Sequence, residues 1–515
     1  MRPASVFSNN MVLLRDRKTC IFGEGTDGEV IKVRLKNMET GSEETAEAVA
    51  QEGTWKTFLP AHAAGGSYEL IITGATEECV LQNVTFGEVW IAAGQSNMEL
   101  ELQNAQDGEQ ELATDNPDIR YYNVVKSPVA DDSLVEQEKY RFWHSCVNGD
   151  FRDISGVAYF FAKELAKKIG VPIGIIDCFQ GGTSISCWLS EENLVSVPEG
   201  IPYKEAYEAV IKDQTEEEYD RLLAEYNQTL AGYNERVDAV KAKNPDVTPE
   251  ELNEQAGDYP WPPPMGRKSL FRPYGLYYTM VQRIIPYTVQ GVLYYQGEED
   301  AQKTERYDVL LKKLIEQYRK DFENPSLPFI YLQLPMFIGK RDTDDYSWGR
   351  TRLAQAKAAK EVDNVGLVVL LDLGEFDNVH PVDKRTPGVR TAKYVLEHIY
   401  QQDVKGTAME LNDISPESAE LKLSFKNTYG KIICHDNGLL DIRHAAEGND
   451  PTGFELSQDG KAWTPAKARI DGEVIYLQAD VEKDCYVRYG YFNYGKVNVY
   501  NAEELPLAPF LLKRK

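Results

Sequence analysis

A serine that could act as a nucleophile lies in residues 94–98, which run Gly-Gln-Ser-Asn-Met. This segment directly follows the apolar run 89–93, which is typical of a buried strand. Open α/β sheets place their sites at the carboxyl ends of parallel strands, where a turn could project the Ser96 hydroxyl into a crevice beside backbone N–H groups. The alternative is an ordinary turn, because Gly, Ser and Asn are common in turns.

A serine hydroxyl needs a general base, and the sequence offers these histidines: His62, His144, His380, His398, His435 and His444. Those in the terminal β-rich regions, and the one in the helical pattern of residues 391–400, are expected to be surface or packing residues. His144, in a loop before a helix, remains an alternative. His380 follows the apolar strand expected at 366–371, at the sheet edge where a base is needed, so we expect it to be the base.

An acidic residue stands three positions before this histidine. The Asp-x-x-His spacing of Asp377 and His380 would let the carboxylate meet the ring nitrogen that does not face the serine, which fixes the tautomer and stabilises the imidazolium. Asp372 or Glu375 could take this place instead, and the acidic run 372–377 could also be a solvated loop. We prefer Asp377 for its spacing.

A serine that attacks a carbonyl also needs hydrogen-bond donors for the oxyanion. Residues 181–184, Gly-Gly-Thr-Ser, follow the strand expected at 173–176, and their glycines let a backbone amide approach the reacting group. Residues 295–298, Tyr-Gln-Gly-Glu, follow the strand expected at 291–294, and the Gln296 amide could donate a second hydrogen bond. Both segments could be simple turns, and the glutamate at 298 could be a buried structural carboxylate.

These segments must be positioned by a regular scaffold, and strands alternate with helices from residue 89 onward. Strands are expected at 89–93, 173–176, 291–294, 329–334 and 366–371, and helices near 155–169, 274–285, 304–322 and 351–361. Such alternation predicts an α/β fold in which helices cover both faces of a parallel sheet. All four chemically suggestive segments then lie at one edge of that sheet.

The flanking regions have a different pattern. Residues 1–85 contain short alternating strands and predict a β-sandwich-like domain, residues 86–404 form the catalytic domain, and residues 405–515 predict a second β domain that could pack with the first. Within the catalytic domain, residues 195–265 are rich in Glu and Lys and end in a proline-rich stretch. We interpret this segment as a helical insertion.

Composition limits the possible partners. The chain of 515 residues carries 82 acidic and 56 basic side chains, and its net charge of -26 disfavours nucleic acid and anionic lipid. No apolar run approaches the roughly 20 residues of a membrane helix. The seven cysteines are dispersed without a CxxC pair, and there is no HExxH motif, so neither a metal nor a cofactor is expected. The first residues lack an apolar signal core, which predicts a cytoplasmic protein unless a leader has been removed.

Several motifs together resemble the sialate O-acetylesterase family of SGNH hydrolases. They are Gly87-Glu88-Val89-Trp90, Gly94-Gln95-Ser96-Asn97-Met98, Gly181-Gly182-Thr183, Tyr295-Gln296-Gly297-Glu298 and Asp377-Asn378-Val379-His380-Pro381. The resemblance extends to both ends of the chain, through residues 6–13 and 499–510. It implies a flavodoxin-like three-layer fold and a carbohydrate O-acetylesterase with a Ser-His-Asp site made of Ser96, His380 and Asp377.

The resemblance also implies roles for neighbouring groups. The oxyanion would be bound by the amides of Ser96 and Gly182 and by the side chain of Gln296. Contacts with substrate are expected from these four residues: Gln95, Asn97, Thr183 and Glu298. The expected partner is an acetylated sugar or oligosaccharide.

The chain departs from the family pattern at two places near the expected substrate. Residues 299 and 300 are Glu-Asp where Ser-Asn is common, and Cys187 stands where Ala is usual. The preferred sugar, either acetylated sialic acid or an acetylated plant glycan such as xylan, xyloglucan or mannan, therefore stays open. Tyr259 and Trp261 could form a wall of the sugar site or belong to a structural loop.

Two other classes of protein remain as alternatives. One is a carbohydrate-binding protein without catalysis, although such a protein has no need of all three triad candidates at strand ends. The other is an esterase of non-sugar esters, a peptidase or a lipase that uses the same triad. Residues 94–98 lack the Gly-x-Ser-x-Gly elbow of lipases, which argues against the last of these.

Overall fold

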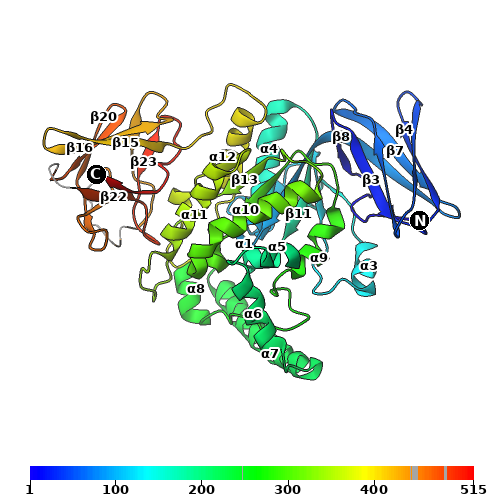
Figure 1. Ribbon diagram of the computed structural model, residues 1–515, viewed down its shortest axis with the longest axis horizontal. Helices are drawn as coiled ribbons and strands as arrows, with labels where there is room; N and C mark the ends of the chain where they lie inside the picture. Colours follow the sequence, from blue (N-terminus) through cyan, green and yellow to red (C-terminus); the bar gives the residue numbers. More distant parts are fainter. Residues whose placement is uncertain (246, 441, 443–449, 481–483, 515) are drawn as a thin grey trace.

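A computed structural model of the chain describes residues 1–245, 247–440, 442, 450–480 and 484–514 (Figure 1). One of the histidines considered above, His444, lies outside the described residues.

The centre of the molecule is a parallel sheet. In spatial order its strands are β9 (Asn116–Asn123), β11 (Ile173–Phe179), β8 (Glu78–Gly94), β12 (Gly291–Tyr295), β13 (Phe329–Leu332) and β14 (Val365–Val368). The short strand β10 (His144–Cys146) pairs antiparallel with β9 at one edge. Every residue of β11 is buried, as an apolar strand covered on both faces should be.

Helices pack on both faces of this sheet (Figure 1). The main ones are α4 (Gly156–Ile169), α10 (Thr304–Asp321), α11 (Ser347–Glu361) and α12 (Arg385–His398). Neighbouring residues of β8 point to opposite sides: Trp90 packs against Phe161 of α4 with ring centroids 5.4 Å apart, whereas Ile91 joins the core that contains Leu310 of α10. The α/β class predicted from the alternating pattern is confirmed.

Two of the expected elements differ in the structure. The helix expected at 274–285 is two short pieces, α9 (Gly275–Thr279) and the 3₁₀ helix η3 (Val281–Ile284), because Met280 between them leaves helical geometry (φ −125°, ψ −60°). The strand expected at 366–371 ends with β14, and Leu371–Leu373 forms the 3₁₀ helix η5.

The amino-terminal strands continue the central sheet on one side. Strands β2 (Val12–Leu14), β4 (Val30–Asn37), β5 (Glu43–Val49) and β7 (Gly65–Thr73) join it through β8, while β1 (Arg2–Pro3), β3 (Thr19–Glu24) and β6 (Thr54–Leu59) form a separate sheet. Strand β8 runs uninterrupted through residue 85, where the sequence predicts a domain boundary. Hydrogen bonding therefore crosses that position, and the division into domains stays a prediction.

The carboxyl-terminal strands lie at the opposite end of the molecule (Figure 1). One sheet contains, in spatial order, β15 (Glu410–Glu417), β16 (Glu420–Lys426), β21 (Val474–Gln478) and β20 (Ala468–Asp471). A second sheet contains β19 (Thr464–Pro465), β18 (Phe454–Ser457), β22 (Cys485–Tyr489) and β24 (Phe510–Arg514). A third consists of β17 (Ile432–Cys434) paired with β23 (Val499–Asn501). Their core includes Met336, Val369 and Leu371 from loops of the central sheet. These strands consequently pack against the part of the chain that leads to His380.

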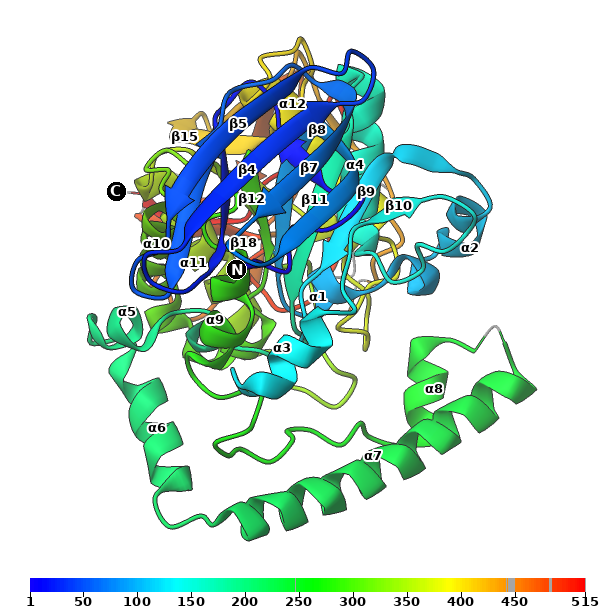
Figure 2. The ribbon, with the colours of Figure 1, turned by 90° about the vertical axis from the view of Figure 1, so that its right-hand side faces the viewer.

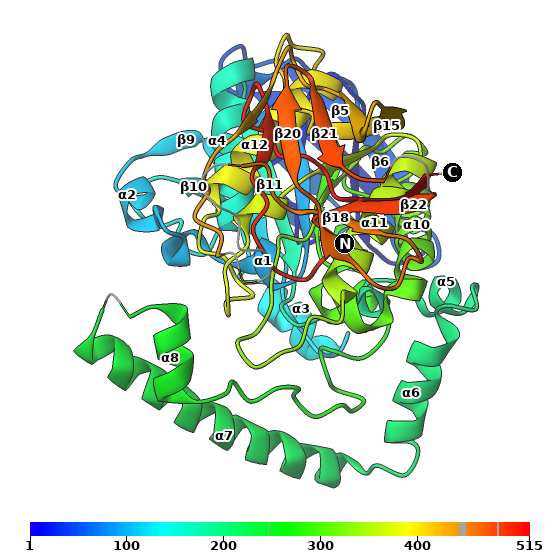
Figure 3. The same ribbon diagram turned by 90° about the vertical axis from the view of Figure 1, so that its left-hand side faces the viewer.

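The insertion expected at 195–265 is a helical arm that projects below the rest of the molecule in the views of Figures 2 and 3. Helix α5 (Glu191–Val195) leads into the arm, which consists of α6 (Ile201–Ile211), α7 (Glu216–Lys243) and α8 (Pro249–Ala256), and α8 packs back on α7. Thr215 caps α7 through the backbone N–H of Glu218, and Thr248 forms a capping box with Glu251 at the start of α8. None of the helices in the described ranges is long and apolar enough to cross a bilayer.

The remaining short helices are α1 (Ser96–Glu99), η1 (Leu102–Asn104), α2 (Gly108–Leu112), α3 (Asp132–Glu138), η2 (Ile185–Cys187) and η4 (Glu298–Lys303).

Candidate active site

Three of the suggestive segments begin at the same level of the central sheet. Gly94, the last residue of β8, lies opposite Phe179 at the end of β11 and opposite Tyr295 at the end of β12. The loops that follow these strands therefore start side by side at the carboxyl edge, where open α/β sheets form their crevices.

The backbone before the serine needs glycine at position 94. Gly94 has a φ of 132°, and a Cβ built there would lie 2.1 Å from the carbonyl oxygen of Tyr295. This close approach lets the Gln95 N–H donate to the same carbonyl at 3.0 Å. The chain then turns at once into α1, and Ser96, its first residue, is half-buried.

Ser96 and His380 come together across 284 positions of sequence. The His380 Nε2 atom lies 2.8 Å from the Ser96 Oγ atom, which is hydrogen-bonding distance. The histidine loop is fixed by Asn378, which accepts from the His380 N–H at 3.0 Å and donates to the His380 carbonyl at 3.1 Å. Burial of its surroundings, together with the positive charge of Lys384, lowers the pKa of His380 from 6.5 to about 4. A neutral imidazole is the form that can accept the Ser96 proton.

The structure does not join Asp377 to His380. Asp377, which has a φ of 56°, accepts from the Lys340 N–H at 2.9 Å and from the Asn253 side chain at 3.4 Å. Among the described residues, no hydrogen bond links the Asp377 carboxylate to the imidazole of His380. The spacing in sequence was therefore not enough to place this side chain, because the contacts of Asp377 come from segments distant in the chain.

The two other candidate carboxylates are also engaged elsewhere. Asp372 forms a two-pronged ion pair with Arg390 at 2.6 and 2.8 Å. Glu375 accepts from the Val382 N–H at 3.0 Å and from the Asn378 side chain at 2.6 Å, so it braces the histidine loop.

Two glycines border the serine. A Cβ built on Gly181 would lie 3.2 Å from the Cβ of Ser96, so this loop packs directly against the nucleophile candidate. Gly182 has a left-handed φ of 68°, which favours glycine. Among the described residues, the N–H groups of Ser96 and Gly182 have no protein acceptor, in contrast to the Gly181 N–H, which donates to Glu99. The Ser96 and Gly182 N–H groups are thus left available as donors, in two loops that pack against each other at Gly181.

Gln296 is buried and its amide hydrogens are already used. Its Nε2 atom donates to the Thr183 carbonyl at 3.1 Å and to the Asp300 carboxylate at 2.7 Å, while its Oε1 atom accepts from Tyr307 at 2.7 Å. An oxyanion would have to compete with both acceptors. The arrangement fits a brace between two loops better than the donor role expected from the sequence.

Three of the four expected substrate contacts are also internal. Gln95, Asn97 and Thr183 are at most 3% exposed. Gln95 accepts from two backbone N–H groups, and the hydroxyl of Thr183 donates to the Gln180 carbonyl at 2.7 Å. We therefore assign these three side chains to support of the loops instead of contact with substrate. The fourth residue, Glu298, keeps one carboxylate oxygen without a hydrogen-bond partner.

A buried polar chain beneath the site was not foreseen. The Lys384 Nζ atom donates to Asn97 Oδ1 at 2.7 Å, and Asn97 Nδ2 donates to Glu298 at 2.6 Å and to the Val379 carbonyl at 3.0 Å. Burial lowers the pKa of Lys384 to about 8 and raises the pKa of Glu298. This chain ties the serine loop to the histidine loop. The lysine precedes an ordinary helix, so its sequence carries no signal of the role.

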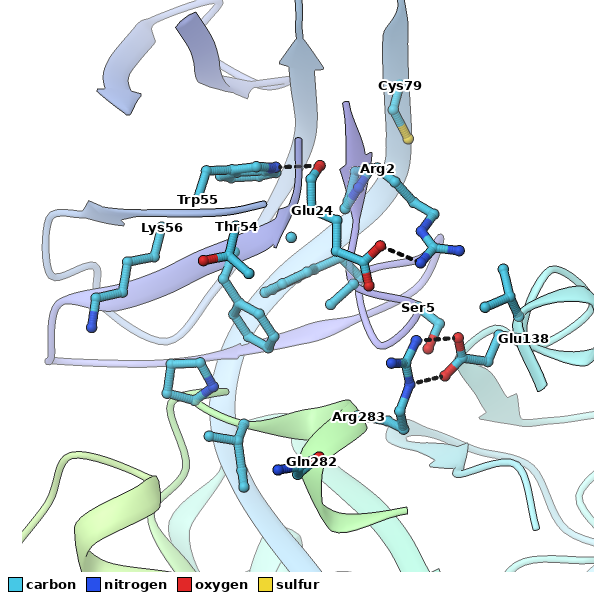
Figure 4. A pocket seen from close by; sticks show the side chains of 18 of the residues that line it. Arg2, Ser5, Glu24, Thr54, Trp55, Lys56, Cys79, Glu138, Gln282 and Arg283 are labelled. Carbon is cyan, nitrogen blue, oxygen red and sulfur yellow. Dashed lines mark hydrogen bonds and ion pairs between the residues drawn. The ribbon is translucent and has the colours of Figure 1, made fainter. Parts of the chain in front are cut away.

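A separate cavity of about 1040 Å³ lies among the amino-terminal strands, α3 and η3 (Figure 4). Arg283 pairs there with Glu138 at 2.6 Å, and Arg2 pairs with Glu24. None of the predicted site residues lines this cavity. In the described part of the chain, no three His, Cys, Asp or Glu side chains gather as a metal-binding group.

Comparison with known proteins places this geometry in a family. A family model described as "Carbohydrate esterase, sialic acid-specific acetylesterase" matches residues 86–231 and 266–394, which is more than half of the chain and includes every site segment above. The chain belongs to this family. Residues 1–85, 232–265 and 395–515 lie outside the match, and 232–265 is the internal gap between its two parts.

Individual relatives agree with this assignment. The chain is 25% identical to mouse sialate O-acetylesterase over 99% of its own length and 94% of the mouse protein. It is 24% identical to human sialate O-acetylesterase, over 76% of this chain and 69% of the human protein. A crystal structure described as a novel carbohydrate acetylesterase from Xanthomonas citri is similar over 99% of both chains, with 26% identity and a TM-score of 0.75.

Proposed function

We propose that this carbohydrate esterase is a serine O-acetylesterase that hydrolyses acetyl esters of sugars, with Ser96 as nucleophile and His380 as general base. The observation that carries the proposal is the 2.8 Å contact between Ser96 Oγ and His380 Nε2, beside two free backbone N–H groups. A hydroxyl, a neutral base and donors for the oxyanion are the groups that acyl transfer requires.

The reaction proceeds in two transfers of the acetyl group. His380 takes the Ser96 proton as Oγ attacks the acetyl carbonyl, and the N–H groups of Ser96 and Gly182 bind the oxyanion. The ester C–O bond breaks, and His380 gives the proton to the leaving sugar oxygen, which becomes a hydroxyl. Water then attacks the acetyl-enzyme, with His380 again moving the proton, which releases acetate and restores Ser96.

Asp377 is proposed as the carboxylate that orients the protonated imidazole. It lies in the same loop, three residues before His380, and the 3.4 Å hydrogen bond that holds its Oδ2 atom is long. A change of side-chain rotamer that gives up this bond and the 2.9 Å bond from the Lys340 N–H would free the carboxylate for the histidine. Gln296 is proposed to act by holding Thr183 and Asp300 in place.

The arrangement of strands supports a flavodoxin-like SGNH fold. Counted from β8 and without the edge strand β9, the parallel strands follow the spatial order 2-1-3-4-5, which is the flavodoxin-like order. We propose a catalytic domain at 86–404 between β domains at 1–85 and 405–515.

The substrate is proposed to be an acetylated sugar or oligosaccharide. The names of the mouse and human relatives point to acetylated sialic acid, and that of the Xanthomonas citri enzyme points to carbohydrate acetyl esters more generally. Acetate release from acetylated sialic acid and from acetylated xylo-oligosaccharides would decide between them.

Substitution of the proposed groups tests the mechanism. Ser96→Ala and His380→Ala should each lower kcat on 4-nitrophenyl acetate and on acetylated sugars by about three orders of magnitude or more, because each removes a group of the acyl-transfer unit. Asp377→Asn should lower kcat by a smaller factor. His398→Ala is the matched control: His398 lies on α12 and its ring contacts Thr407 at 2.7 Å. Parental activity in folded Ser96→Ala would overturn the proposal.

A further inference from the structure

Residues 232–265, the internal gap in the family match, contact the candidate active site at two points. Asn253 of α8 donates to the carbonyl of Asp377 at 3.3 Å and to its carboxylate at 3.4 Å. Further along, the Trp261 ring lies against Gly182, so close that a Cβ on Gly182 would be 2.1 Å from the ring edge. Residues 232–265 thus contact both the histidine loop and the glycine loop. The internal gap in the family match thus borders the groups proposed to react.

Trp261 and Tyr259 form an exposed aromatic surface, which we call the aromatic platform. The two rings are 43% and 50% exposed, and they lie at an interplanar angle of 29° with centroids 6.4 Å apart. Large aromatic side chains left this exposed next to a site are typical of binding surfaces.

Two further aromatic side chains pack against the platform. Phe271 meets Trp261 edge-on at 5.4 Å, and Tyr233 of α7 meets Tyr259 edge-on at the same centroid distance. The ion pairs Lys340–Glu254 and Arg341–Asp258 fasten the same part of the arm to the histidine side of the site. The rings therefore need little reordering to bind a ligand, which reduces the entropy lost on binding.

The chemistry of the platform suits a sugar ring. Flat aromatic faces bind the apolar C–H face of a pyranose, while the sugar hydroxyls stay in water. The chain has a net charge of -26, and the cations Lys340 and Arg341 beside the arm are already paired with Glu254 and Asp258, so a neutral sugar is accommodated more easily than an anionic one.

We propose that Tyr259 and Trp261 bind the pyranose rings next to the acetylated residue, which makes neutral acetylated oligosaccharides the preferred substrates. Trp261 contacts Gly182, and the neighbouring Gly181 contacts Ser96, so a sugar on Trp261 lies close to the sugar that carries the ester. The proposal deepens and rests on the proposed esterase function.

Three variants test the platform through kinetics. Tyr259→Ala and Trp261→Ala should each lower kcat/KM on acetylated xylo-oligosaccharides by about tenfold, mainly through KM, and the double variant should lower it further. In Tyr259→Ala, activity on 4-nitrophenyl acetate, which lacks neighbouring sugars, should change less than about threefold. Trp261→Phe should retain most of the oligosaccharide activity. Tyr140→Ala is the matched control, because Tyr140 is 78% exposed and lies in the segment after α3.

Direct binding separates failure of the platform from failure of the esterase. Unacetylated xylo-oligosaccharides should bind the parental protein and Ser96→Ala in calorimetry, and the double platform variant should bind at least about tenfold more weakly. Binding that depends on the platform without any acetate release would retain the platform and overturn the esterase. Equal binding and equal kcat/KM in parent and double variant would overturn the platform. A loss of 4-nitrophenyl acetate activity as large as the loss on oligosaccharides, in Tyr259→Ala as well as Trp261→Ala, would also overturn it.

Discussion

The pH dependence of hydrolysis tests the environment of His380. A histidine base works only while it is neutral, so the rate is full above its pKa and falls as the pH drops through that pKa. Burial of its surroundings lowers the pKa of His380 to about 4, with the charge of Lys384 as second cause. Because the His380 side chain itself reaches solvent, we expect the acidic midpoint of kcat/KM between about 4 and the ordinary 6.5.

The lowered pKa of His380 changes the fraction of neutral imidazole most in mildly acidic solution. At about pH 5.5, an imidazole with a pKa of about 4 is about 97% neutral, whereas one with a pKa of 6.5 is about 9% neutral. The parental enzyme should therefore keep up to about tenfold more of its neutral-pH activity than an unperturbed histidine allows. Lys384→Met removes a positive charge that disfavours the imidazolium, so its acidic midpoint should move upward.

The assay is acetate release from 4-nitrophenyl acetate between about pH 4 and 8, with thermal unfolding recorded at each pH to exclude loss of structure. Lys393→Met, on helix α12, is the control for removal of a lysine near Lys384 in the chain. A parental midpoint at or above 6.5 would refute the argument from burial. An unchanged midpoint in folded Lys384→Met would refute the role assigned to its charge.

Two further predictions concern stability. Arg390→Met should lower the free energy of unfolding by about 3–5 kcal/mol in urea titrations, because it leaves the buried carboxylate of Asp372 without its cation. Adding Asp372→Leu should restore much of the lost stability. A loss below about 1 kcal/mol in Arg390→Met would contradict this explanation. Asp177→Asn should raise Tm by an amount that grows above about pH 4, because burial raises the pKa of Asp177 well above 3.8 and the unfolded chain loses that proton first. A Tm difference independent of pH would be evidence against this cause.

The platform gives the helical arm a physical purpose in this enzyme. Long insertions at the edge of a rigid sheet often carry specificity, since the scaffold positions them while their sequence can vary. Here α7 lies away from the sheet (Figure 2), and the chain after it brings Tyr259 and Trp261 back to Gly182. The same return places Asn253 on Asp377. The arm thus has the means to influence both binding and the geometry of the histidine loop.

Much of the scaffold followed from local patterns. The apolar runs at 173–176 and 291–294 became β11 and β12, and the amphipathic pattern at 304–322 became α10, because hydrophobic periodicity reports directly on which face is buried. The same logic placed residues 96 and 380 at one sheet edge, and the structure brings their side chains together. The sequence by itself was sufficient for the α/β class and for this pair.

Tertiary packing alone decided where the surrounding polar side chains point. Asp377 accepts hydrogen bonds from Asn253 and Lys340. The Gln296 amide donates to Thr183 and Asp300, and Lys384 donates to Asn97 of the serine loop. Apart from the Gln296–Asp300 bond, which spans four residues, each of these contacts joins segments far apart in the chain, and no period or spacing encodes them. A polar side chain in a crowded interior takes the hydrogen bonds that its neighbours offer, and the neighbours are known only once the chain has folded.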